Sequence, residues 1–133
     1  MEGNIVNDKA YWATTGIFCA FFCFGGAGHL FRADNIVDGM THLGYPLYVM
    51  TILGVAKLCG VVALLVPGQA LLKEWAYAGF AFDLIGAAAS HAFVGDSLIE
   101  IAPPIVLFAV GTGSYLLRPA ARRLMPQPSQ HAT

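Results

Sequence analysis

The chain has 133 residues, of which 57% are hydrophobic and only 11% are charged. In soluble domains roughly a quarter of all residues are charged, so this composition predicts one integral-membrane domain instead of a soluble protein. The formal net charge is −1 and the basic residues are dispersed along the chain. This pattern excludes the continuous basic face by which proteins bind nucleic acids.

Four apolar runs follow one another along the chain, each near the roughly 17 to 25 residues that a bilayer crossing requires. They cover residues 11–31, 46–66, 75–94 and 103–117. Tyr45-Pro46 is predicted to open the second run, Pro67-Gly68 to close it, and Pro103-Pro104 to open the fourth. We therefore predict an all-α fold, a polytopic membrane protein with a four-transmembrane-helix bundle. The predicted organisation is a cytoplasmic N-terminal segment at 1–10, the transmembrane domain at 11–118 and a flexible cytoplasmic tail at 119–133.

Lysine and arginine residues predict the orientation of these spans. With four crossings, five of the six basic residues that flank the spans lie on one side of the membrane, and Arg32 lies on the other. The five are Lys9, Lys73, Arg118, Arg122 and Arg123. Cytoplasmic loops carry the excess of positive charge, so both termini are expected in the cytoplasm, with the bacterial inner membrane as the expected location.

Two charged residues lie inside the predicted spans. Lys57 precedes the end of the second span by nine residues, and Asp83 follows the start of the third by eight. At 1.5 Å per residue both lie roughly 12 to 14 Å from the same surface, so we expect them to pair. Intramembrane charges are costly and often functional. The pair is either a structural ion pair or the polar centre of a site that handles a proton or a substrate.

Small and polar residues accompany this pair. Gly79, Gly86, Ala87 and Ser90 share a helical face with Asp83, and Gly54 lies near Lys57. Such a stripe either lets helices pack closely or leaves room for a ligand. In the second interpretation Ser90, Gly86 and Gly54 contribute to substrate binding.

Two histidines lie near the outer ends of the spans, His29 in the first and His91 in the third. They are either structural or act as acid/base and ligand-binding groups, with Asp96 as a further substrate-binding residue. Two histidines with Asp96 or Glu100 are also a metal ligand set, and two facing histidines a haem ligand set. No close spacing motif supports either, so we predict no metal site and no haem.

Two further groups of residues are predicted to be structural. Cys19, Cys23 and Cys59 lie within spans, where thiols usually act as small packing groups. Six aromatic residues near the span ends are expected to anchor the helices at the membrane interface: Tyr11, Trp12, Tyr45, Tyr48, Trp75 and Tyr77.

The segments "HLGYPLYVMTILGVAKLCG" (42–60) and "LKEWAYAGFAFDLIGAAASHAFVGD" (72–96) resemble the DoxX-like family of small membrane proteins, and the resemblance extends over roughly residues 11–117. It implies a four-helix membrane bundle and, through the association of founding members with thiosulfate:quinone oxidoreductase, contact with quinone chemistry. The polar positions that it marks are His29, Lys57, Glu74, Asp83, His91 and Asp96. A fold shared by many activities does not identify one of them.

We expect an integral-membrane enzyme that acts on a lipophilic small molecule by acid/base chemistry, such as isomerisation, cyclisation or epoxide opening. Its catalytic residues would be Asp83, Lys57, His91 and His29, and it would require no cofactor. One alternative is a quinone-binding subunit of a membrane oxidoreductase, which needs a redox partner. Another is a non-enzymatic assembly factor. The bilayer, a lipophilic small molecule and a homo-oligomer are the expected partners.

Overall fold

The protein is entirely helical in the computed structural model, which describes residues 2–125. This part of the chain contains five α-helices and a 3-10 turn. In order they are α1 (Glu2–Leu30), α2 (Asp34–His42), α3 (Tyr48–Leu65), α4 (Ala70–Phe93), α5 (Leu98–Leu116) and η1 (Ala120–Arg122). The predicted all-α fold is confirmed.

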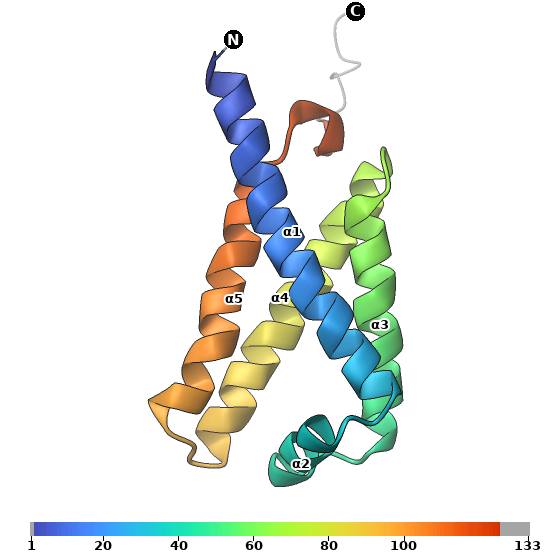
Figure 1. Cartoon of the computed structure of the whole chain (residues 1–133), viewed down its shortest axis with the longest axis vertical. Helices are drawn as coiled ribbons and strands as arrows, with labels where there is room; N and C mark the ends of the chain where they lie inside the picture. The colour runs from blue at the N-terminus through green and yellow to red at the C-terminus, as the bar shows by residue number, and fades with distance from the viewer. Residues whose placement is uncertain (1, 126–133) are drawn as a thin grey trace, which may run out of the picture.

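Four long helices form the bundle, and α1 crosses it diagonally (Figure 1). Helix α1 packs against both α3 and α5, while α4 packs against α3 on one side and α5 on the other. The short helix α2 lies at the end of the bundle opposite to the start of α1 (Figure 1). We call the end with α2 the outer end and the end where α1 begins the inner end.

Within residues 2–125, helices α1, α3 and α5 are long and apolar enough to cross a membrane. Helix α4 is 24 residues long, but it does not reach the same apolar content because Asp83, Ser90 and His91 interrupt it. Three of the four predicted spans thus coincide with helices whose length and composition suit a membrane crossing. The third run, residues 75–94, lies in α4, which packs between α3 and α5.

The structure differs from the sequence prediction at two outer segments, the start of α5 and the segment that forms α2. Helix α5 begins at Leu98, so Pro103 and Pro104 lie inside it instead of opening it. Ser97 caps this helix by accepting a hydrogen bond from the Ile99 N–H at 3.3 Å, and the sequence Ser-Leu-Ile-Glu has the spacing of a capping box. Helix α2 was not predicted, although the spacing of its apolar residues is helical.

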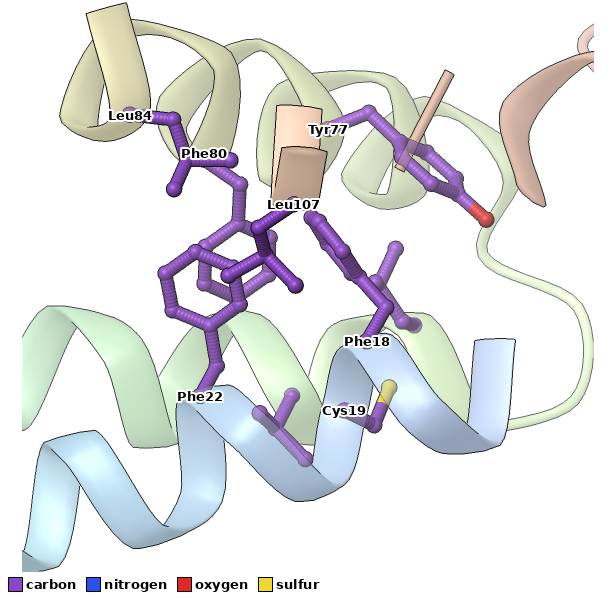
Figure 2. Packing of buried hydrophobic residues seen from close by; sticks show 9 residues of the cluster. Phe18, Cys19, Phe22, Tyr77, Phe80, Leu84 and Leu107 are labelled. Carbon is purple, nitrogen blue, oxygen red and sulfur yellow. The ribbon is translucent and has the colours of Figure 1, made fainter. Parts of the chain in front are cut away.

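The core lies between α1, α3, α4 and α5, with rings from α1 and α4 at its centre (Figure 2). The ring centroids of Phe22 and Phe80 are 4.1 Å apart, and Phe18 meets Phe80 edge-on at 5.3 Å. Glycines of the facing helices make room for these rings, because a Cβ at Gly111 would lie 2.5 Å from Phe18. Cys19 is buried in this cluster, as predicted for a packing thiol, whereas Cys23 and Cys59 are exposed and do not pack in the core.

Cations bind the C-terminal end of α3 at the inner end. Lys73, which is completely buried, donates to the carbonyls of Ala63 at 2.9 Å and of Val66. Arg122 donates to the carbonyls of Leu64 at 2.9 Å and Leu65 at 3.4 Å. The last carbonyls of a helix have no partner within it, so these cations satisfy them and complement the helix dipole.

The predicted flexible tail therefore begins with a docked segment. The η1 turn places Arg122 against α3, and Arg123 donates to the Arg118 carbonyl at 2.6 Å. Residues 119–125 are held by these bonds, whereas 126–133 lie outside the described residues.

Two aromatic residues that we expected at the membrane interface are core residues instead. Tyr11 is fully buried and Tyr77 is 7% exposed. The Tyr77 hydroxyl is 2.7 Å from Ser114, which is 2.6 Å from Thr15. These hydroxyls satisfy one another, which allows a polar cluster to lie inside the bundle.

The close crossing of α1 and α3 gives a stability prediction. A Cβ at Gly54 would lie 2.7 Å from Leu30 Cγ and 3.0 Å from the Gly26 carbonyl oxygen, and a backbone atom cannot move away cheaply. We expect Gly54→Ala to lower the free energy of unfolding by about 1 to 3 kcal/mol, measured by unfolding in detergent micelles. Gly16→Ala is the matched control, because nothing lies within 4 Å of its Cβ position. Equal stability of the two variants would contradict the close crossing.

Candidate functional site

Lys57 of α3 and Asp83 of α4 face each other inside the bundle. The Lys57 Nζ lies 3.6 Å from Asp83 Oδ2, and the two side chains are 14% and 20% exposed. The pairing predicted from their depth is confirmed. Within residues 4–125 neither side chain makes a hydrogen bond to another residue. The ammonium protons that do not face Asp83 and the remaining carboxylate lone pairs are therefore available to a bound molecule.

Three cavities meet at this pair. An outer cavity of about 400 Å³ lies beneath α2 and is lined by His29, Met40 and Tyr45 as well as the pair. A central cavity of about 180 Å³ reaches Phe22 and His91. A third cavity of about 520 Å³ runs between α3 and α4 toward Trp75. The pair is thus the point at which all three cavities can be reached.

His29, at the end of α1, presents one ring nitrogen to the outer cavity. Its Nδ1 lies 2.7 Å from the Gly25 carbonyl. A carbonyl only accepts hydrogen bonds, so Nδ1 must carry a proton. In the neutral ring Nε2 is then an acceptor, and it has no hydrogen-bond partner within residues 4–125. His29 can therefore accept a proton or a hydrogen bond from a molecule in this cavity.

Asp96, in the turn between α4 and α5, binds two histidines at once. His91 Nδ1 lies 2.6 Å from Asp96 Oδ2, and His42 Nε2 lies 2.7 Å from Asp96 Oδ1. The carboxylate holds the His91 ring in one orientation with Nδ1 as the donor, so that in the neutral ring Nε2 is the acceptor, and His91 lines the central cavity. His91 and His29 line different cavities, which are joined by the ion pair.

The predicted substrate-binding residues have different surroundings. The Ser90 hydroxyl donates to the Gly86 carbonyl at 2.7 Å and lies 2.6 Å from the Tyr45 hydroxyl, which it positions at the outer cavity. Asp96 is engaged by the histidines. Gly86 lines the outer cavity, and no atom lies within 4 Å of its Cβ position. Gly54 packs against α1 instead.

Sequence reasoning missed the α2 residues and the role of Tyr45 in the site. Ile36, Gly39 and Met40 line the outer cavity from α2. Their spacing along "DNIVDGMTH" was the available signal, since Ile36 and Met40 are four residues apart on one helical face. Tyr45 was assigned to interface anchoring because its position in the turn could not be seen in the sequence.

Glu74, one of the polar positions that the family resemblance marks, lies outside the site. Glu74 binds Arg118 at 2.7 Å and the Tyr115 hydroxyl at 2.9 Å at the inner end.

The described residues 4–125 contain no group of three or more His, Cys, Asp and Glu side chains that could hold a metal ion. The described polar groups around the cavities thus offer hydrogen bonds and proton transfer.

Hydrogen bonds from His91 and His42 lower the pKa of Asp96 below its ordinary value. A lowered pKa means that folding favours the charged form, so the contribution to stability is complete at neutral pH and is lost as the pH falls below about 3.9. His42 ends α2, so this interaction fastens α2 over the outer cavity.

We expect Asp96→Asn to loosen α2, because an amide binds two histidines less strongly than a carboxylate does. Hydrogen–deuterium exchange at pH 7 should show several-fold faster exchange of the α2 amides. Asp38→Asn, which changes an exposed α2 carboxylate, should exchange like the wild type. Below the folded pKa of Asp96 the difference between Asp96→Asn and the wild type should disappear. Unchanged exchange in Asp96→Asn at pH 7 would show that the carboxylate does not hold α2.

A scan of protein families matches residues 13–114 to the DoxX-like family. Neither the curated proteins nor the solved structures yielded a match. The match covers all of α3 and α4 and nearly all of the bundle, including both residues of the central ion pair. The chain therefore belongs to the DoxX-like family.

Proposed function

We propose that this protein is an integral-membrane enzyme that binds a lipophilic small molecule beside Lys57 and Asp83 and moves a proton within it. The observation that carries the proposal is the ion pair itself. Its two groups are 3.6 Å apart, make no other hydrogen bond within residues 4–125 and line three cavities. A purely structural ion pair in an apolar interior is stabilised by further hydrogen bonds, which are missing here.

The chemistry follows from the two groups. The Lys57 ammonium donates a hydrogen bond to an oxygen of the substrate and stabilises negative charge that develops there. The Asp83 carboxylate accepts a proton from the substrate and returns it at another position, which leaves the overall composition unchanged. Isomerisation, cyclisation and intramolecular epoxide opening are reactions of this kind. None of them requires a redox cofactor.

The histidines connect this centre to the outer end. The free Nε2 atoms of His29 and His91 line the cavities on either side of the pair. They exchange protons between the centre and the outer end, with Asp96 orienting His91. These roles make Lys57, Asp83, His29 and His91 the proposed acid/base set.

The proposed topology is four transmembrane helices, with α4 as the fourth. Three observations support it: α4 is 24 residues long, it packs between two apolar helices, and the inner end carries Lys73, Arg118 and Arg122. The inner end is then cytoplasmic by the positive-inside rule. The outer cavity opens toward the opposite face.

We expect the purified protein in mild detergent to carry a lipophilic compound that is not a phospholipid, detected by native mass spectrometry and identified by chromatography. The double variant Lys57→Met/Asp83→Asn should lose it. Removing both partners avoids leaving one charge stranded. When the compound is returned to the wild type, an isomeric or rearranged product should form.

Asp38→Asn is the control for this experiment, because it neutralises an exposed carboxylate that lines none of the three cavities. A bound quinone that the protein alone leaves unchanged would favour the quinone-binding alternative. Phospholipid alone in the wild type, with none of the compound, would favour an assembly factor.

The topology is checked by single cysteines introduced at residues 3 and 125 in a background without native cysteines. Both should react with an impermeant maleimide from the cytoplasmic side only, because four crossings return the chain to its starting side. Labelling from opposite sides would mean an odd number of crossings and would remove α4 from the membrane.

A further inference from the structure

The largest of the three cavities extends the proposed site along the bundle. It measures about 520 Å³ and is lined by residues of α3 and α4, and among the described residues Lys57 and Asp83 are the only charged groups that line it. This volume lies within the range of about 300 to 1,000 Å³ that small-molecule sites occupy. We call it the α3–α4 groove.

The groove opens to the surroundings of the bundle. Leu72, Trp75 and Phe82 line it and are exposed. Inside it, Gly79 has no atom within 4 Å of its Cβ position, whereas on the opposite wall a Cβ at Gly60 would lie 2.5 Å from Phe80. The two glycines therefore differ: Gly60 seats a ring of the core, and Gly79 leaves space. With α3 and α4 both spanning the membrane, this space faces acyl chains.

The ion pair at the end of the groove restricts the charge of the ligand's head group. Lys57 and Asp83 together carry no net charge, so a charged head group placed beside them would add an uncompensated charge in a region of low dielectric constant. A hydroxyl or carbonyl head adds none. Such a head accepts a hydrogen bond from the Lys57 ammonium, and a hydroxyl also donates one to Asp83.

We propose that the α3–α4 groove binds the apolar tail of an uncharged single-chain amphiphile, whose hydroxyl or carbonyl head lies at Lys57 and Asp83. This inference rests on the proposed function and names its substrate class and its route of access. The groove and the outer cavity share Leu53 and Phe82 in addition to the pair. The tail enters from the bilayer side, and the outer cavity stays open for water and proton exchange.

Trp75 lines the groove and provides a direct test. The chain has two tryptophans, so in a Trp12→Phe background all tryptophan fluorescence comes from Trp75. The probe is octadecanol brominated at the middle of its chain, added to the protein in phosphatidylcholine vesicles. We expect Trp75 quenching that saturates with the probe and is reversed by unbrominated octadecanol.

Substitutions that fill the groove should weaken this binding. Gly79→Leu fills it from α4 and Ala56→Leu from α3, and each should raise the apparent Kd about tenfold or more, that is by about 1.4 kcal/mol or more. Gly16→Leu, on α1 with no atom within 4 Å of its Cβ position, is the matched control. Circular dichroism and thermal unfolding show whether each variant is folded, and one folded groove variant suffices.

The outcomes separate the groove from the polar centre. Quenching that increases linearly with the probe, without saturation, overturns the proposal. Saturable quenching that persists in both groove variants but is lost in Lys57→Met/Asp83→Asn overturns the groove and leaves the proposed function standing. In a third outcome, the groove variants weaken the saturable quenching but Lys57→Met/Asp83→Asn leaves it unchanged. This result overturns the position of the head, and with it the proposed role of the pair.

Discussion

The cost of placing charge in an apolar interior determines how this bundle is arranged. Lys57 and Asp83 come from neighbouring helices and lie 3.6 Å apart, which fixes the register of α3 against α4, because a shift of one residue would rotate a charge toward the surroundings of the bundle. Each group compensates the other, and neither makes a further hydrogen bond within residues 4–125. The interaction therefore sets the helix register while it leaves hydrogen-bonding capacity unused, and both the fold and the proposed site depend on it.

The glycines divide the helices into close-packed and open faces. Gly54, Gly60 and Gly111 each accept a neighbouring side chain so closely that a Cβ would meet it at 2.7, 2.5 and 2.5 Å. Gly79 and Gly86 of α4 have no atom within 4 Å of their Cβ positions. Gly54 shared the small-residue pattern of Gly79 and Gly86 in the sequence, because composition is the same whether a neighbouring helix or a cavity lies opposite. Three-dimensional packing decides which glycine serves which purpose.

The sequence predicted the parts of the site that depend on depth along a helix. The all-α fold and the pairing of Lys57 with Asp83 follow from hydropathy and from the rise per residue. The contact of His42 with Asp96 and the burial of Tyr11 depend on how segments distant in the chain come together, and no local pattern records that. The apolar spacing of α2 was a local signal for a helix, but it did not record that α2 covers the outer cavity. The position of α5 is an intermediate case: the capping box at Ser97 marked its start, but the proline pair was the stronger signal and misplaced it.

The two ends of the bundle have opposite properties, and this difference makes the open site compatible with a stable fold. At the inner end Lys73 and Arg122 satisfy four carbonyls of α3, and the guanidinium of Arg118 lies 3.9 Å from the Tyr115 ring centroid. Charge-assisted bonds of this kind are stronger than neutral ones, and they tie α3, α4 and α5 together at this end. At the outer end α2 is held mainly by side chains, through His42 to Asp96 and Tyr45 to Ser90. A few side-chain contacts open at lower free energy than a packed core does. Movement of α2 can therefore admit water or a proton to the outer cavity while the inner end keeps the helices that carry Lys57 and Asp83 in register.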